Sequence, residues 1–258
     1  MSAAALLALL QRDRAVVLAS LFTVIVLAWA YLLVGAGIEM EMMDLGGGQT
    51  MAMLPEWSTG YAIIVLVMWA VMMVAMMLPS AAPVVLLAAA IDSRNDAGQG
   101  RSRLFASGYL LVWFGFSLLA TALQWALDTA GLLSESMAIS SRLIVGAVLV
   151  SAGIYQWTPL KQACLRRCRS PFDLLVRYWG QGSKGAVVAG MRHGLFCLGC
   201  CWMLMALLFV GGLMNLAWIG GIALLVLTEK MLPWGGRMSR IAGVVLVVWG
   251  GAVLSTAL

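Results

Sequence analysis

Charged residues are scarce in this sequence. Only 10% of its 258 residues are Asp, Glu, Lys or Arg, whereas 63% are hydrophobic, and the mean hydropathy is +0.98. A soluble domain carries more charge than this, so the composition excludes that class and predicts a membrane protein. Motifs for nucleotide binding, phosphate binding and acyl transfer are missing as well. We therefore expect neither an enzyme nor ATP-driven transport by this chain alone, and we expect no nucleic-acid partner.

Histidine and cysteine are also rare. His193 is the only histidine, and three of the five cysteines follow it between positions 197 and 201. All five cysteines fall in the second half of the chain, which is not the pattern of a disulfide framework. The rarity of these residues makes their clustering the first feature to explain.

Seven apolar segments are long enough to cross a bilayer, which takes roughly 20 residues each. They are residues 15–36, 61–91, 104–127, 139–157, 186–212, 215–231 and 241–258. The sixth is short and follows the fifth after a tight turn. The sequence predicts an all-α, polytopic transmembrane helix bundle of about seven spans, folded as a single membrane domain over residues 1–258.

The basic residues predict the orientation of these spans. With the N-terminus inside, Arg142 is the only one of the 16 Lys and Arg residues that falls in an outer loop. Positive charge is retained on the cytoplasmic side of membrane proteins, and this also explains the net charge of +5. We expect a multi-pass protein of the bacterial inner membrane with its C-terminus outside and the lipid bilayer as its first partner.

The second predicted span contains many methionines and two prolines. Its methionines recur at helical spacing and form a wide sulfur-rich stripe; they are Met68, Met72, Met73, Met76 and Met77. Pro79 and Pro83 cannot donate backbone hydrogen bonds, so we expect a kink, and the segment is long enough to contain a break. The stripe could bind metal through Met72, Met73, Met76 and Met77, but methionine is also an adaptable packing residue.

The first outer loop, residues 40–53, places five methionines among carboxylates. Thioethers can bind Cu(I) on an oxidising face, where thiols would be lost. The alternative is an interfacial loop whose methionines dip into lipid.

The fifth predicted span begins with a group of potential metal ligands. On a helix, His193, Cys197 and Cys201 lie at i, i+4 and i+8 and share a face, with Cys200 beside it. Imidazole and thiolate are ligands for Cu(I) and Zn(II). Each cysteine alone could equally be a small buried hydrophobe. A single helix stacks these ligands along its length, so other donors are needed to complete a site.

Cys164 and Cys168 are candidates for those donors. They are spaced at i and i+4 in a basic segment that we expect along the inner membrane surface, where neighbouring arginines favour the thiolate. A methionine or a second subunit could also complete the site, so a homo-oligomer is possible. The alternative is a surface helix with incidental cysteines.

Four stretches carry a family resemblance: residues 69–83, 158–171 and 193–202, and the pair Glu229-Lys230. They resemble a bacterial family of predicted metal-binding integral membrane proteins, a domain of unknown function, over about residues 60–235. The resemblance implies a metal-binding membrane protein but names no metal.

Together these features predict a metal-binding protein that handles copper, with zinc as the second choice of ion. Methionine and Cys/His ligands would serve transport, or delivery to a membrane or periplasmic protein partner. Two alternatives are a membrane thiol redox protein and a non-catalytic assembly or structural subunit.

Overall fold

Ten helices and one short hairpin make up the described part of the chain in a computed structural model. The described residues are 3–35, 41–44, 50–53, 56–92, 100–170, 172–179 and 181–257. The helices are α1 (Ala3–Leu33), α2 (Thr59–Asp92), α3 (Arg101–Thr129), α4 (Arg142–Tyr155), α5 (Pro159–Arg169), α6 (Phe172–Trp179), α7 (Gly182–Ala206), α8 (Leu208–Gly211), α9 (Leu216–Met231) and α10 (Gly235–Ser255). The hairpin pairs β1 (Glu41–Asp44) with β2 (Thr50–Met53) in antiparallel register.

Each of the seven predicted spans coincides with helical structure. Among the described residues, five spans are long and apolar enough to cross a membrane: α1, α2, α3, α7 together with α8, and α10. Helices α4 and α5 meet at 62° and would form a sixth span as a bent pair. Helix α9 has 16 residues, fewer than the roughly 20 that a bilayer requires. The helical bundle is thus confirmed, while the count of seven spans and their orientation stay predictions.

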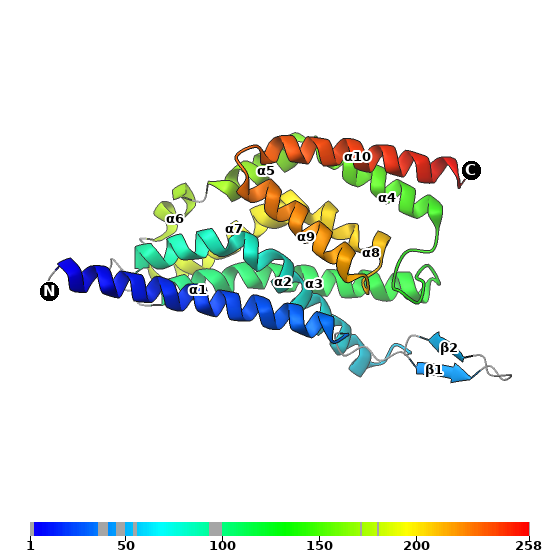
Figure 1. Cartoon of the computed structure of the whole chain (residues 1–258), viewed down its shortest axis with the longest axis horizontal. Coiled ribbons are helices and arrows are strands. Elements are labelled where there is room, and N and C mark those ends of the chain that lie inside the picture. The colour runs from blue at the N-terminus through cyan, green and yellow to red at the C-terminus, as the bar shows by residue number, and fades with distance from the viewer. Residues whose placement is uncertain are drawn as a thin grey trace.

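The long helices pack side by side along one axis of the molecule. Helix α3 lies against α7, α4 against α10, and α1 against α2 (Figure 1). The two chain ends lie at opposite ends of this axis (Figure 1). The outward faces are apolar: the side chains of Phe22, Leu119 and Val248 are 69%, 70% and 66% exposed. Exposed apolar surface on this scale is what helices in contact with lipid require.

The prolines of α2 do not break the helix. Pro79 and Pro83 lie inside one continuous helix, so this segment, which is long enough to contain a break, contains none. Hydroxyl groups supply hydrogen bonds next to the prolines: the carbonyl of Met77 accepts one from Ser80 Oγ at 2.8 Å and one from Tyr109 Oη at 3.3 Å. The predicted kink stays a prediction.

Glycines let α3 and α7 approach closely. A β-carbon added to Gly108 of α3 would collide with the carbonyl oxygen of Val187, and one added to Gly190 of α7 would collide with that of Phe105. Small residues at such crossings allow helix backbones to pack together in membranes. This contact holds α7, the helix that carries His193, against α3.

We expect Gly108→Ala to lower the free energy of unfolding by about 1–3 kcal/mol, the usual range for overpacking. The new methyl group would meet a backbone carbonyl, which cannot rotate away as a side chain can. Thermal unfolding in detergent measures the effect. Gly115→Ala on the same helix is the control, because no atom lies within 4 Å of the position that its new methyl group would take. It should leave stability unchanged or raise it by ~0.5–1 kcal/mol. Equal effects of the two substitutions would contradict close packing.

The predicted first outer loop contains the β1–β2 hairpin, which the sequence did not predict. Its register pairs Glu41 with Met53 and Asp44 with Thr50. The side chains of residues 40–53 lie outside the described part of the structure. The expectation that their methionines bind metal therefore stays a prediction.

Candidate functional site

Buried ionisable side chains mark the candidate site inside an otherwise apolar bundle. Lys161 and Glu229 are 0% and 1% exposed, Lys230 is 7% exposed and His193 is 1% exposed. Charged side chains are costly inside a membrane bundle and occur there mainly where they serve function. These groups surround the cysteines of α7.

Cys197 lies at the centre of this group. Lys230 Nζ, from α9, donates a hydrogen bond to Cys197 Sγ at 2.8 Å, and Tyr109 Oη, from α3, lies 3.1 Å from the same sulfur. Lys230 also donates to Ser80 Oγ of α2 at 2.9 Å. Polar groups of two helices, α3 and α9, therefore converge on one thiol of α7, and Lys230 links that thiol to Ser80 of α2. An ammonium group in this position can offset negative charge that collects on the Cys197 sulfur.

The other thiols gather around Cys197. Cys200 and Cys201 each donate a hydrogen bond to the Cys197 carbonyl, at 3.0 and 2.9 Å. The side chain of Cys168, on α5, interacts with those of Cys197 and Cys200. Cys164 is half-buried, and its sulfur faces Gly199 of α7, where a β-carbon would lie 2.8 Å away. The cysteines predicted to complete the site are thus brought to it, and all five are free thiols.

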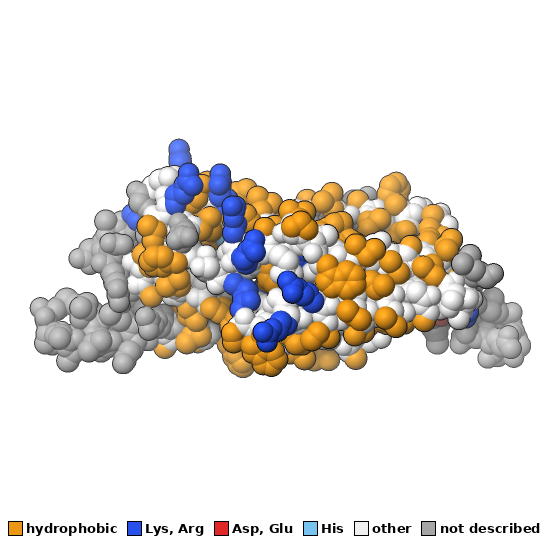
Figure 2. Space-filling model, turned by 90° about the horizontal axis from the view of Figure 1, so that it is seen from above, with side chains coloured by type: hydrophobic (Ala, Val, Ile, Leu, Met, Phe, Trp, Pro, Cys, Tyr) orange, Lys and Arg blue, Asp and Glu red, His pale blue; other side chains and the backbone are white. Residues whose placement is uncertain are grey.

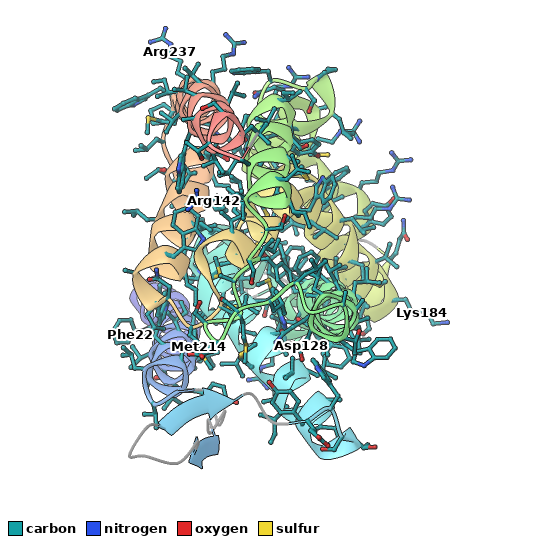
Figure 3. All side chains as sticks on the ribbon, turned by 90° about the vertical axis from the view of Figure 1, so that its right-hand side faces the viewer. Phe22, Asp128, Arg142, Lys184, Met214 and Arg237 are labelled. Carbon is teal, nitrogen blue, oxygen red and sulfur yellow. The ribbon has the colours of Figure 1, made fainter. Side chains whose placement is uncertain are left out.

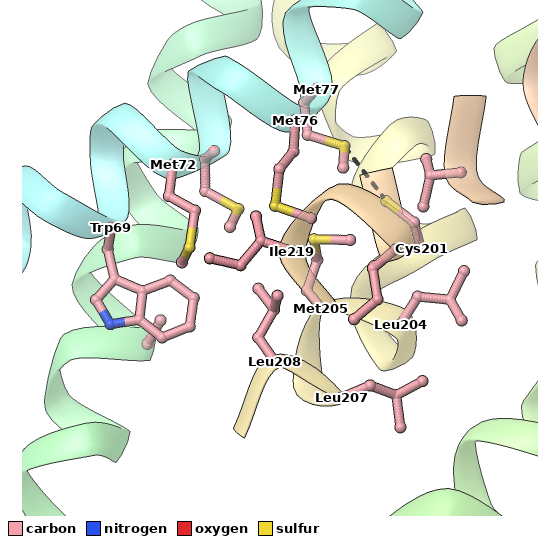
Figure 4. Close-up of a cluster of buried hydrophobic side chains, with 14 of the residues drawn as sticks. Trp69, Met72, Met76, Met77, Cys201, Leu204, Met205, Leu207, Leu208 and Ile219 are labelled. Atoms are coloured by element: carbon pink, nitrogen blue, oxygen red, sulfur yellow. Dashed lines mark hydrogen bonds between the residues drawn. The ribbon is translucent and has the colours of Figure 1, made fainter. Parts of the chain in front are cut away.

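Methionine sulfur continues the cluster. Cys201 Sγ lies 3.9 Å from Met77 Sδ of α2, and Lys230 Nζ lies 4.0 Å from the same atom. In Figure 4 the sulfur atoms of Met76, Met77 and Met205 lie close to Cys201, between α2 and α7. Thioether and thiol donors therefore share one buried region.

Met72 and Met73 lie farther along α2, in the hydrophobic core. Both are fully buried, and in Figure 4 Met72 lies between Trp69 and Met76. Trp69 is fixed there by a hydrogen bond from its Nε1 to Gln124 Oε1, at 2.7 Å. The burial of Met72 and Met73 agrees with a packing role, and metal binding by these two residues stays a prediction.

His193 is packed between aromatic rings at one end of the cysteine cluster. Its ring centroid lies 5.9 Å from that of Phe105 and 5.7 Å from that of Tyr109. Its Nδ1 atom is buried and has no hydrogen-bond partner among the described residues. His193 therefore borders the cluster, one helical turn from Cys197, and its role as a ligand stays a prediction.

A second buried network lies beside the thiols. Lys161 Nζ contacts Glu229 Oε2 at 2.7 Å and also donates to Gln156, whose Oε1 accepts a hydrogen bond from Ser239 at 3.2 Å. Glu229 therefore pairs with a lysine of another helix and not with Lys230, its neighbour in the sequence. Glu229 and Lys230 are consecutive on α9 and point to different partners: Glu229 to Lys161, and Lys230 to Cys197.

Sequence reasoning missed several residues of the site, among them Lys230, Tyr109 and Met205. Lys230 carried a signal, because a lysine adjoining an acid at the end of an apolar segment needs a partner. Tyr109 and Met205 carried none, since aromatic and methionine residues are common throughout the spans.

The cluster is rich in sulfur but is not a preformed multidentate centre. In the part of the chain that the structure describes, no three His, Cys, Asp or Glu side chains are arranged to hold a metal ion. The donors that do converge are thiols from α5 and α7 and a thioether from α2. Soft sulfur ligands select Cu(I), which accepts low coordination numbers.

A family model described as "PpoB2: Copper chaperone" matches residues 66–253. The chain belongs to this family. The match includes the cysteine cluster, the methionines of α2 and most of α10, so it extends beyond the predicted core of residues 60–235 at the C-terminal end. The match supports a resemblance to a metal-related family, but it does not specify the family of predicted metal-binding membrane proteins. Comparisons with curated proteins and with solved structures give no match.

Proposed function

We propose that this chain is a membrane-embedded copper chaperone that binds Cu(I) in its buried sulfur cluster and delivers it to a protein partner. The convergence of Cys168 of α5 with Cys197 and Cys200 of α7, next to the contact between Cys201 and Met77 of α2, carries this proposal. These donors come from one chain, so a second copy is not required for binding. We assign a binding and delivery role, not catalysis, and place the protein in the bacterial inner membrane with its N-terminus inside.

The order of the sulfur atoms supports passage by ligand exchange. Cys164 is the half-buried donor, Cys168 and Cys197 are buried, and Met77, Met76 and Met72 follow along α2 toward its Thr59 end. Thiols thus lie toward the predicted cytosolic side, where a reducing environment preserves them, and thioethers lie toward the other side. Cu(I) could move along this series without leaving sulfur coordination.

Metal loading of the purified protein tests the function. Under reducing conditions in detergent, we expect near-stoichiometric Cu(I), measured by elemental mass spectrometry, and weaker retention of Zn(II). Loaded protein should transfer copper to an apo copper-dependent partner faster than free exchange allows. Retention of Zn(II) but not Cu(I) would contradict the copper assignment, and retention of neither ion would leave the redox and structural alternatives.

We expect Lys230→Met to weaken Cu(I) affinity about 10–100-fold, the usual cost of losing a group that supports a metal ligand. A Cu(I) ion held by two thiolates leaves a buried negative charge, which the ammonium 2.8 Å from Cys197 Sγ neutralises. Competition with a Cu(I) chelator measures the affinity. Lys184→Met is the control because Lys184 is exposed near the start of α7. An affinity equal to that of the wild type would contradict a role for Lys230 in copper binding.

A further inference from the structure

A basic surface pocket lies between α5 and the first turns of α10, outside the sulfur cluster. Its volume is about 540 Å³. Four arginines line it: Arg166 and Arg169 on α5, and Arg237 and Arg240 on α10. Figure 2 views the side of the molecule on which α5 and α10 lie, and Lys and Arg side chains gather there in the half nearer the start of α1. The proposed function does not use this pocket.

The four guanidinium groups have no carboxylate to balance them within the described residues. The residues that line the pocket include no Asp or Glu, and the ion pair of Lys161 with Glu229 is the one found in that part of the chain. Like charges on facing walls repel each other, and an anion between them would remove that cost. The positive charge of the pocket therefore favours the binding of a negatively charged ligand.

The pocket is held in shape by backbone contacts. Arg169 Nη2 donates a hydrogen bond at 2.6 Å to the carbonyl of Leu232, which joins α9 to α10. Trp157 Nε1 donates one at 3.1 Å to the carbonyl of Arg240. One arginine is thus fixed across the pocket, and the first turns of α10 are tied to the end of α4. Prearranged guanidinium groups are well suited to bind phosphate, because each can donate two parallel hydrogen bonds.

The surroundings of the pocket are apolar and exposed. Trp234, which lines it, is 54% exposed, and Leu160 and Ile241 on the flanking helices are 61% and 58% exposed. Tryptophan is enriched where membrane meets water, and basic pockets between spanning helices on the cytoplasmic side bind anionic lipid headgroups. Acyl chains could lie along these exposed residues while a phosphate enters the pocket.

We propose that this pocket binds the phosphate of an anionic phospholipid headgroup from the inner leaflet, and that the bound phosphate links α5 to α10. This inference rests on the proposed membrane location but not on copper binding. Because α5 carries Cys164 and Cys168, the bound lipid would also fix the helix that completes the sulfur cluster.

Native mass spectrometry of delipidated protein with added phosphatidylglycerol or phosphatidylcholine tests the proposal. We expect retention of phosphatidylglycerol over phosphatidylcholine, and roughly a tenfold weaker retention for each arginine removed in Arg166→Gln and Arg237→Gln, since hydrogen bonds to charged groups are of that strength. Lys184→Gln removes an equal charge on the other side of the bundle from Arg237, as Figure 3 shows, and should keep the lipid.

Two further measurements make the outcome decisive. The double variant Arg166→Lys/Arg237→Lys keeps the charge but loses the paired hydrogen bonds, so it should fold and still bind the lipid more weakly than the wild type. Inorganic phosphate is the second probe. A rise in the melting temperature of the wild type with phosphate, and none in the glutamine variants, would support a phosphate site. If the wild type retained no lipid, that site would be assigned to a soluble ligand. Lipid retention that is equal in wild type and glutamine variants, or no response to either probe, would overturn the proposal.

Discussion

The double variant Cys168→Ser/Cys197→Ser is expected to bind Cu(I) more than about a hundredfold more weakly than the wild type. Loss of a supporting group near a metal typically costs 10–100-fold, and here two direct sulfur donors would be removed. Serine keeps the size of cysteine but replaces soft sulfur with a hydroxyl group that Cu(I) does not favour. The side chain of Cys168 interacts with that of Cys197, so both substitutions act on the same position between α5 and α7.

Chelator competition under reducing conditions measures this affinity, and Cys164→Ser is the matched control. Cys164 is on the same helix as Cys168 but is half-buried and faces Gly199. We expect Cys164→Ser to slow copper loading and to change the equilibrium affinity by less than the double variant does. If the double variant bound Cu(I) as tightly as wild type, the sulfur cluster would not be the copper site.

The other large effect is expected on stability. Glu229→Ala should lower the free energy of unfolding by about 3–5 kcal/mol, because it leaves the Lys161 ammonium buried without a counter-charge. Both side chains of the pair are almost fully buried, and their charged atoms are 2.7 Å apart. Thermal unfolding in detergent, with the copper-free protein, measures this change without interference from metal binding.

A double-mutant cycle separates the ion pair from general packing. Lys161→Met/Glu229→Leu removes both charges and fills the space with apolar atoms, so it should recover most of the lost stability, as apolar replacements of buried pairs often do. Glu229→Gln keeps the shape of the side chain and an acceptor for Lys161. Its stability should therefore lie between that of Glu229→Ala and that of the double variant. The double variant is compared with the single variants Lys161→Met and Glu229→Leu. A loss of stability equal to the sum of the losses in these two variants would show that Lys161 and Glu229 do not interact.

Much of the fold could be predicted from local sequence patterns. Runs of apolar residues identify α1, α2, α3 and the helices that follow, because each backbone hydrogen bond in a membrane must be satisfied within its own segment. Helical periodicity likewise places His193, Cys197 and Cys201 on one face of α7, and the structure buries all three. The continuity of α2 through Pro79 was not predictable from the local sequence, because a proline inside a helical pattern usually kinks or breaks the helix.

Contacts between distant segments could not be derived in the same way. The order of residues does not predict that Lys230 donates a hydrogen bond to Cys197. It also does not predict that Glu229, the residue before Lys230, pairs with Lys161. A rotation of about 100° between consecutive residues of a helix separates these two side chains, and the packing of α9 against α5 and α7 decides what each one meets.

The sequence by itself determined that this is a chain of apolar helices, several of them long enough to cross a membrane, with its sulfur-bearing residues concentrated on a few of them. Hydrophobic run length and helical period are local properties, and both can be read in order along the chain. Only the tertiary structure decided that Cys168, Cys197 and Met77 share one buried region with a lysine, and that four arginines line one pocket. These arrangements depend on which faces of the helices are in contact. Close packing over the whole bundle determines those contacts, including glycine contacts such as that of Gly108 with α7.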